Sequence, residues 1–142
     1  MKLSIAHLCI YTKDLEATRR FYCEGLGMKK VFDFTLNGSL YGFYMEMAAG
    51  NYIEVFHSNS FSDTNSGAMR HLCLETDNIK NARKRLTDAG IDTTEITKGC
   101  DNTYQFWFKD PNGIDIELHQ YTDQSSQLTG QNCEVDWDVE GE

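Results

Sequence analysis

Strand-like and helix-like hydrophobic patterns alternate along the chain in the same order in both halves. Apolar positions recur at helical spacing in two segments, 14–27 and 77–90, and runs rich in β-branched and aromatic residues surround each of them. Asp14 is placed as the N-cap of the first helix, and glycines close it. In the first half, strand, helix and three strands are predicted at 5–11, 14–27, 29–36, 40–47 and 52–57. In the second half, the same order is predicted at 69–76, 77–90, 96–99, 103–109 and 114–121.

The two halves also resemble each other in sequence, which indicates an internal repeat. HLCIYTKDLEATRR, beginning at His7, aligns with HLCLETDNIKNARK, beginning at His71. Further along, YIEV at 52–55 aligns with DIEL at 115–118. We therefore predict one α+β domain over residues 1–122, with a strand–helix–three-strand (βαβββ) module in each half. Its parts are module one at 1–57, a polar linker at 58–68 and module two at 69–122, followed by an acidic tail at 123–142.

Strand alternation places a histidine and a glutamate of each module on the same face of its sheet. Successive strand residues point to opposite faces, so Leu8 and Ile10 share one face and His7 takes the other. The same alternation holds in the other three strands concerned, where aliphatic residues take the face opposite each of the remaining candidates. Two imidazoles and two carboxylates suit a borderline divalent ion such as Ni, Zn, Co, Mn or Fe. The four candidate metal ligands are His7, Glu54, His71 and Glu117.

The remaining histidines and the cysteines near the candidate ligands are not expected to bind metal. A lone strand histidine more often packs or hydrogen-bonds than binds metal, and it is the matched pattern in both modules that favours ligation. Cys9 and Cys73 share the ligand face but lie about 6.5 Å further along their strands, so they are expected to be small wall residues. His57 has the opposite parity to the neighbouring glutamate and is expected at the surface. His119 is expected to line the site without binding metal.

Composition and charge exclude several classes of protein. No stretch approaches the length of a membrane helix, and the start of the chain lacks the features of a signal peptide. Five cysteines without a CxxC pair favour reduced thiols in a cytoplasmic protein. The net charge of −9 is concentrated in the tail, which holds six acidic residues and no Lys or Arg, so nucleic-acid binding is not expected.

The motifs together resemble the glyoxalase, bleomycin-resistance and dioxygenase group, the vicinal oxygen chelate superfamily. The resemblance spans nearly all of residues 1–122 and is carried by HLCIYTKDLEATRRFYCEGLGMKK, YIEVF, HLCLETDNI and FWFKDPNGIDIELHQY. It implies two βαβββ modules that form an eight-stranded cupped mixed sheet, with helices on the outer face.

Within that superfamily, the ligand set is similar to that of bacterial glyoxalase I, or lactoylglutathione lyase. This resemblance implies a metal-dependent lyase, with Ni or Zn the preferred ions and Co, Mn or Fe as alternatives. Its substrate would be a thiol–2-oxoaldehyde hemithioacetal, such as the adduct of methylglyoxal and glutathione, and its chemistry proton transfer through an enediolate. The match implies Glu117 as the mobile base and Glu54 mainly as a ligand, while the sequence leaves open how they share the catalytic role.

Two positions depart from the glyoxalase I pattern and keep alternatives open. Tyr11 and Ser58 stand where that enzyme commonly has an Arg and an Asn that grip glutathione. One alternative is a related metal-dependent enzyme (an epimerase, dioxygenase or thiol transferase) on another small substrate. The other is a metal-free ligand-sequestering protein of the bleomycin-resistance type.

The resemblance also implies an assembly, because each module offers only half a ligand set. We expect a homodimer in which His7 and Glu54 of one subunit meet His71 and Glu117 of the other; pairing within one chain is the alternative.

In the tail, Val135, Trp137 and Val139 alternate with acidic residues. This strand-like period predicts that their apolar face docks on the domain or on a partner chain.

Overall fold

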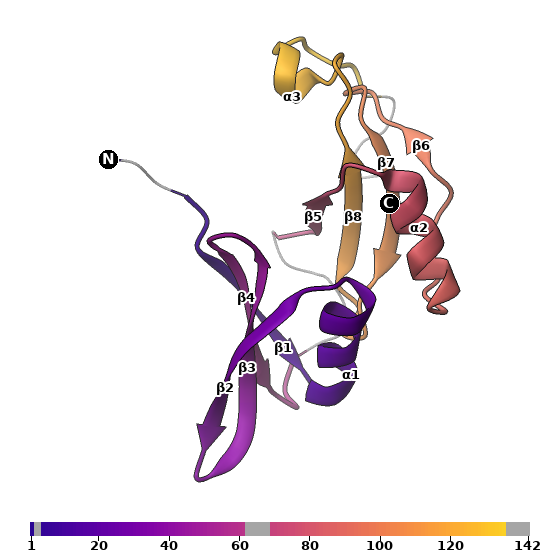
Figure 1. Ribbon diagram of the computed structural model, residues 1–142. Helices are drawn as coiled ribbons and strands as arrows, with labels where there is room; N and C mark the ends of the chain where they lie inside the picture. Colours follow the sequence, from indigo (N-terminus) through magenta and orange to yellow (C-terminus); the bar gives the residue numbers. More distant parts are fainter. Residues whose placement is uncertain (2–3, 62–68, 136–142) are drawn as a thin grey trace. The chain divides into compact units, whose positions relative to one another are not determined.

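The computed structural model describes residues 1, 4–61 and 69–135. The chain divides into two compact units, each of which is described by itself (Figure 1). The first unit comprises Met1–Met69 and Asp110–Ile114, and the second comprises Arg70–Lys109 and Asp115–Glu142. Most of the predicted linker, and Trp137 and Val139 of the tail, lie outside the described residues.

The first unit is a four-stranded mixed sheet with one helical segment. The sheet has the order β1-β4-β3-β2, with β1 parallel to β4 and the other neighbours antiparallel. The helical segment α1–η1 connects β1 to β2, and α1 packs against β4. The elements are β1 (His7–Thr12), α1 (Leu15–Arg19), η1 (Arg20–Gly25), β2 (Lys29–Leu36), β3 (Ser39–Ala48) and β4 (Asn51–His57).

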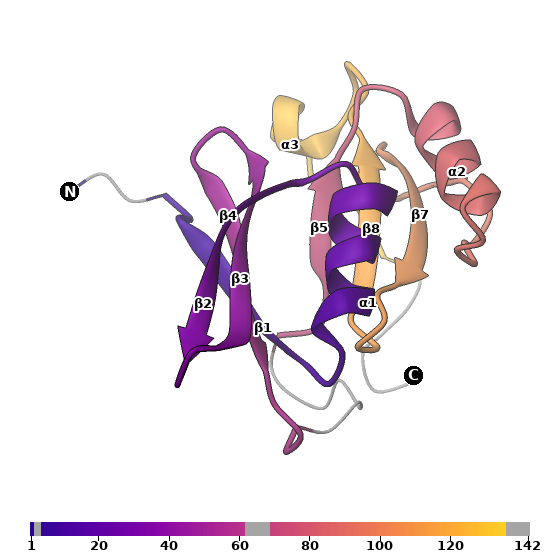
Figure 2. The same cartoon turned by 60° about the horizontal axis from the view of Figure 1, so that its bottom comes forward.

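The second unit repeats this topology. Its sheet has the order β5-β8-β7-β6, and β5 is parallel to β8. Helix α2 packs against β7 and β8 (Figure 2). The elements are β5 (Leu72–Glu75), α2 (Ile79–Asp88), β6 (Thr97–Lys98), β7 (Tyr104–Lys109), β8 (Asp115–Gln120) and the short α3 (Ser126–Thr129).

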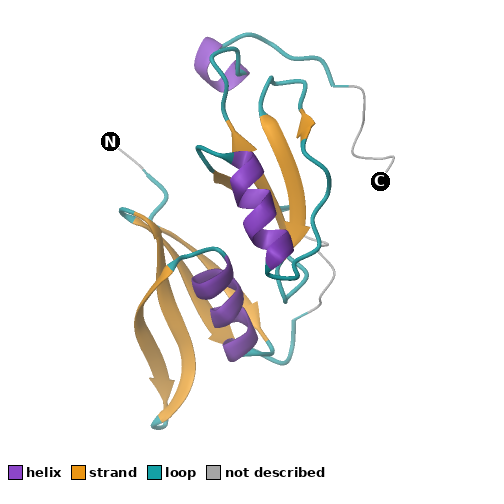
Figure 3. Cartoon of the chain, turned by 45° about the vertical axis from the view of Figure 1, so that its right-hand side comes forward, coloured by secondary structure: helices purple, strands orange, loops and turns teal. Residues whose placement is uncertain are grey.

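The predicted βαβββ order is confirmed in both halves, and each unit pairs a helical segment with a sheet (Figure 3). Helix α1 begins at the expected cap, because Asp14 accepts from the Ala17 amide at 2.9 Å. Helix α2 is capped by Asn78, whose side chain accepts from the Asn81 amide at 3.0 Å. None of the described helices has the length and apolar character needed to cross a membrane.

Several boundaries differ from the sequence prediction. The helix expected at 14–27 is α-helical only to Arg19 and continues as a π-helix, η1, in which Tyr22 is fully buried. The strand expected at 69–76 is confined to Leu72–Glu75, so His71 lies immediately before β5. The strand expected at 96–99 shortens to Thr97–Lys98.

One face of each sheet carries the hydrophobic core. In the first unit, Met45 pairs with Ile53 and Phe43 with Val55 across β3 and β4, and all four side chains are buried. The second unit uses the equivalent positions of β7 and β8. There the buried residues are Phe106, Phe108, Ile116 and Leu118, joined by Ile79 and Leu86 of α2. The remaining face of each sheet is therefore available for the polar candidates.

The DPNG turn is organised by the buried carboxylate of Asp110. One carboxylate oxygen accepts from the backbone amides of Asn112 and Ile114, both at 2.8 Å. The other accepts from the Asn112 side chain at 2.8 Å and from the Tyr22 hydroxyl at 3.0 Å. The Asn112 side chain also donates to Thr18 at 3.2 Å. The turn residues belong to the first unit through these contacts.

Candidate metal centre

The first unit brings together His7 and Glu54. Strands β1 and β4 are parallel neighbours whose register sets Cys9 beside Glu54. His7 lies two residues before Cys9 and therefore on the same face of the sheet. Nε2 of His7 is 3.7 Å from Oε2 of Glu54. Their side chains are 44% and 21% exposed, so the pair is accessible to a ligand.

The second unit brings together His71 and Glu117 in the equivalent arrangement. The register of β5 and β8 sets Cys73 beside Glu117, and His71 precedes β5. Nε2 of His71 is 3.4 Å from Oε2 of Glu117. Glu117 is much less accessible than its counterpart Glu54, because its side chain is only 9% exposed.

Glu117 lies between two histidines, an arrangement not found among the described residues of the first unit. Nε2 of His119 is 2.9 Å from Oε1 of Glu117, on the other side of the carboxylate from His71. That Nε2 atom is buried and has no hydrogen-bond partner among the described residues. Donor atoms of Cys73, Glu117 and His119 all lie within 4.8 Å of one another. In the first unit, the residue aligned with His119 is Phe56.

The thiols beside the two glutamates are held in their protonated form. Partial desolvation by neighbouring atoms, followed by a hydrogen bond to Glu54 and its negative charge, raises the pKa of Cys9 to about 11. Desolvation, followed by the charge of Glu117 and a hydrogen bond to it, raises the pKa of Cys73 to about 12. Without a bound cation, neither thiol is therefore a nucleophile at neutral pH.

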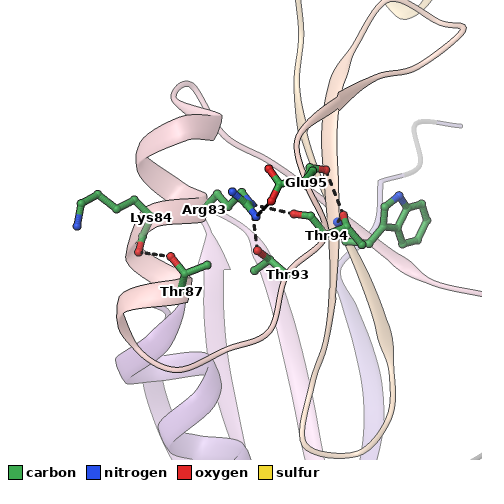
Figure 4. Close-up of polar contacts among 7 residues, drawn as sticks. Arg83, Lys84, Thr87, Thr93, Thr94 and Glu95 are labelled. Carbon is green, nitrogen blue, oxygen red and sulfur yellow. Dashed lines mark hydrogen bonds and ion pairs between the residues drawn. The ribbon is translucent and has the colours of Figure 1, made fainter.

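A hydrogen-bonded segment that follows α2 positions the aromatic neighbour of His71 (Figure 4). Arg83 donates to Thr93 at 3.1 Å and to the carbonyl of Thr94 at 2.8 Å. Thr94 in turn accepts from the Trp107 amide through its hydroxyl at 2.9 Å and donates its own amide to the Trp107 carbonyl at 2.9 Å. The Trp107 ring contacts the His71 ring edge-to-face, with centroids 4.8 Å apart. This contact restricts the orientation of the imidazole.

The candidate face of the first unit is an aromatic surface. Its rings contact one another across the sheet, with Tyr44 stacked between Phe32, at 4.9 Å, and Tyr52, at 5.2 Å. Tyr44 also contacts the ring of His7 at 5.9 Å. Gly42 leaves room for this packing, because a Cβ there would lie 2.8 Å from the Phe56 ring. The members of the aromatic surface are Phe32, Phe34, Tyr41, Tyr44, Tyr52 and Phe56.

The structure thus pairs each predicted histidine with the predicted glutamate of its own unit. It also places Cys73 and His119 next to Glu117, with donor atoms of all three residues within 4.8 Å of one another. The sequence contained a signal for His119, because it lies two residues after Glu117 and therefore on the same face of β8. His57 pairs with Thr12 at the ends of β4 and β1, away from these donors.

The two departures from the glyoxalase I pattern lie at the surface. Tyr11 is 53% exposed, and the Ser58 hydroxyl interacts with the hydroxyl of Ser60 at 3.2 Å. Lys13 lies over the ring of Phe61 at 5.2 Å.

The repeated βαβββ topology and the matched His–Glu pairs agree with the sequence comparison. The chain belongs to the Glyoxalase/Bleomycin resistance protein/Dioxygenase superfamily, whose family model matches residues 4–118. No curated protein matches the sequence.

Solved structures with the same fold include both an enzyme and a binding protein. A glyoxalase family protein from Enterococcus faecalis is 24% identical with a TM-score of 0.72, covering 82% of this chain and 96% of its own. An antibiotic-binding protein from a Streptomyces species is 22% identical with a TM-score of 0.69, covering 86% and 99%. A lactoylglutathione lyase from Agrobacterium tumefaciens is 20% identical with a TM-score of 0.63, covering 82% and 92%. At these identities the likeness shows the fold alone.

The donors present fit a divalent metal of the kind bound by many members of this superfamily. Imidazole and carboxylate ligands suit Zn, Ni and related ions, and thiolate favours Zn among them. The buried Nε2 of His119, which makes no hydrogen bond among the described residues and lies 2.9 Å from Oε1 of Glu117, is the observation that most directly supports a cation site, because a cation could bind both atoms.

Proposed function

We propose that this chain is a metal-dependent enzyme that moves a proton between adjacent carbons beside a carbonyl group, in the manner of glyoxalase I. Its substrate would be a thiol–2-oxoaldehyde hemithioacetal. The observation that carries the proposal is the same His–Glu pair on the same sheet face of both units, His7 with Glu54 and His71 with Glu117. Repetition of the pair argues against a chance contact of one surface histidine.

The two glutamates would have different roles because their surroundings differ. The side chain of Glu117 is 9% exposed and lies beside His71, Cys73 and His119, so water competes little for its carboxylate. Glu117 would take the proton from one carbon and return it to the next, the role for which a positioned carboxylate is suited. Glu54 is more exposed and would mainly bind the metal. The metal, when bound, would act as a Lewis acid that stabilises negative charge developing on the substrate oxygens.

The aromatic contacts of the two histidines would help to hold the ligand set in place. His71 contacts Trp107, and His7 contacts Tyr44. Rings restrained in this way lose less conformational freedom when they bind a metal or substrate. The five free cysteines suit a reducing compartment, and a cytoplasmic enzyme is therefore part of the proposal.

Elemental analysis and an isomerase assay on the same sample test the proposal. Protein purified under metal-replete conditions should contain Ni, Zn or Co and should convert the methylglyoxal adduct of glutathione, or of another small thiol, to the thioester. Glu117→Gln should reduce kcat by about 10²–10⁴-fold, since a positioned acid–base group contributes that much. His57→Gln is the matched control and should keep the activity. Stoichiometric metal without isomerase activity on any thiol adduct would contradict the proposal.

A second candidate function is the sequestration of a planar apolar ligand without metal, and the aromatic surface favours it. Stacked, partly exposed rings around Tyr44 are suited to bind a flat aromatic molecule. Fluorescence titration of metal-free protein with bleomycin tests this candidate. Saturable binding that Tyr44→Ala weakens would support it, while the absence of binding to the metal-free protein would count against it.

A further inference from the structure

In the second unit, two donors that the predicted ligand set does not include lie beside Glu117, which it does include. Cys73 lies directly across from Glu117 in the β5–β8 register, and His119 follows Glu117 by two residues on the same face. Their donor atoms all lie within 4.8 Å of one another. In a tetrahedral zinc site, bond lengths of 2.0–2.3 Å place donor atoms roughly 3.5 Å apart. Small side-chain movements would therefore be enough to bring all three donors onto one ion.

His119 lies beside Glu117 at a position that suits a cation bound by both side chains. Its side chain is only 11% exposed, and its Nε2 atom is buried without a hydrogen-bond partner among the described residues. The Oε1 atom of Glu117 lies 2.9 Å from that nitrogen, within ion-pair distance. A cation bound by both atoms would satisfy the nitrogen and neutralise the carboxylate.

The first unit provides an internal comparison. It has a cysteine beside a glutamate at equivalent places, Cys9 and Glu54, but Phe56 stands where the second unit has His119. The first unit therefore offers two of these donors where the second offers three. Among the described residues, the three-donor group with all its donor atoms within 4.8 Å of one another is Cys73, Glu117 and His119, which assigns the candidate thiolate site to the second unit.

From these observations we propose that Cys73, Glu117 and His119 form a binding position for a thiophilic divalent ion of the Zn²⁺ class within the second unit. One thiolate, one carboxylate and one neutral imidazole balance the charge of the ion. Three protein ligands leave a fourth position open to water or substrate, as in catalytic zinc sites. Binding displaces the Cys73 proton, because a thiol that coordinates a metal is deprotonated.

This position differs from the proposed glyoxalase ligand set in two of its three ligands, Cys73 and His119, and the two sets share Glu117. The two oxygens of Glu117 face different histidines, with Oε2 toward His71 and Oε1 toward His119. The proposed thiolate position uses the Oε1 side and requires neither His7 nor Glu54. It can therefore be tested independently of catalysis.

Cobalt is the probe for this test, because Co²⁺ bound to a thiolate gives a sulfur-to-cobalt charge-transfer band. The reduced, metal-free full-length chain is titrated with CoCl₂ and then with ZnCl₂, which should displace cobalt. We expect a saturable charge-transfer band that Cys73→Ser abolishes. His119→Gln should weaken cobalt binding by at least tenfold, with a circular dichroism melt to confirm that the variant is folded. Cys9→Ser is the matched control and should leave the band unchanged, as should His7→Ala.

Each outcome bears on this position separately from the proposed function. A folded wild-type chain that binds cobalt without a sulfur band, or a band that survives Cys73→Ser, overturns the thiolate position. Equal loss of the band in Cys9→Ser overturns its assignment to the second unit. Isomerase activity without a sulfur band would leave the proposed function intact, whereas a Cys73-dependent band in a protein without isomerase activity would leave only the metal position.

Discussion

The hydrogen bond between Tyr22 and Asp110 is expected to make a measurable contribution to stability. Tyr22 is fully buried and Asp110 is 4% exposed, and the hydroxyl–carboxylate distance is 3.0 Å. Tyr22→Phe removes this bond while retaining the ring and its packing. A hydrogen bond to a charged group contributes about 1.5–3 kcal/mol. Three donors to the Asp110 carboxylate would remain, so we expect the free energy of unfolding to fall by about 2 kcal/mol. This loss lowers Tm by roughly 4–8 °C.

The effect of Tyr22→Phe should also depend on pH. Burial, followed by the negative charge of Asp110 and the hydrogen bond to it, raises the pKa of Tyr22 well above its usual value. The folded chain therefore keeps the phenol proton where the unfolded chain releases it, near its ordinary pKa of about 10. The contribution of Tyr22 is complete below that pH and is lost as the pH rises through the higher pKa of the folded state. The difference in unfolding free energy between wild type and Tyr22→Phe should be constant from about pH 7 to 9. It should shrink above about pH 10.

Urea unfolding followed by circular dichroism measures both effects. Tyr104→Phe, at a residue that is 42% exposed, is the control and should leave stability within about 0.5 kcal/mol of wild type. A Tyr22→Phe variant as stable as Tyr104→Phe would refute the inferred contribution. A stability difference that does not change above pH 10 would refute the role assigned to the phenol proton.

The remaining predictions concern metal binding, subunit assembly and the C-terminal tail. His71→Ala or Glu117→Ala should weaken metal binding at least about tenfold by isothermal titration, since each removes a ligand, and His57→Ala should not; equal losses in all three would indicate general destabilisation. If the glyoxalase-like sites form across a homodimer, a refolded mixture of His7→Ala and His71→Ala chains should regain one complete site and part of the metal binding; mixed dimers that recover none would contradict cross-chain sites. Deletion of residues 131–142 should lower Tm or change the oligomer size seen by light scattering, and a truncated chain unchanged in both would show that the tail does not dock.

The sequence was sufficient to predict the repeated topology and the residue pairs, because both follow from local patterns. Strand alternation in HLCIY and YIEVF places His7 and Glu54 on the same face whatever the exact strand ends are. The repeat then predicts the equivalent pair in the second half, and the structure shows both. Caps such as Asp14 are similarly local, since they depend on the residue and its nearest amides.

The tertiary structure decided which neighbours each predicted residue has. Cys73 and Glu117 are 44 positions apart in the chain, and only the β5–β8 register sets them side by side. Alternation could place His119 on the face of Glu117, but not its Nε2 atom near a carboxylate oxygen, because that depends on the side-chain conformations and burial of both residues. In the same way, the DPNG motif predicts a turn, whereas the hydrogen bond from Tyr22 to Asp110 joins residues 88 positions apart and exists only in the folded chain.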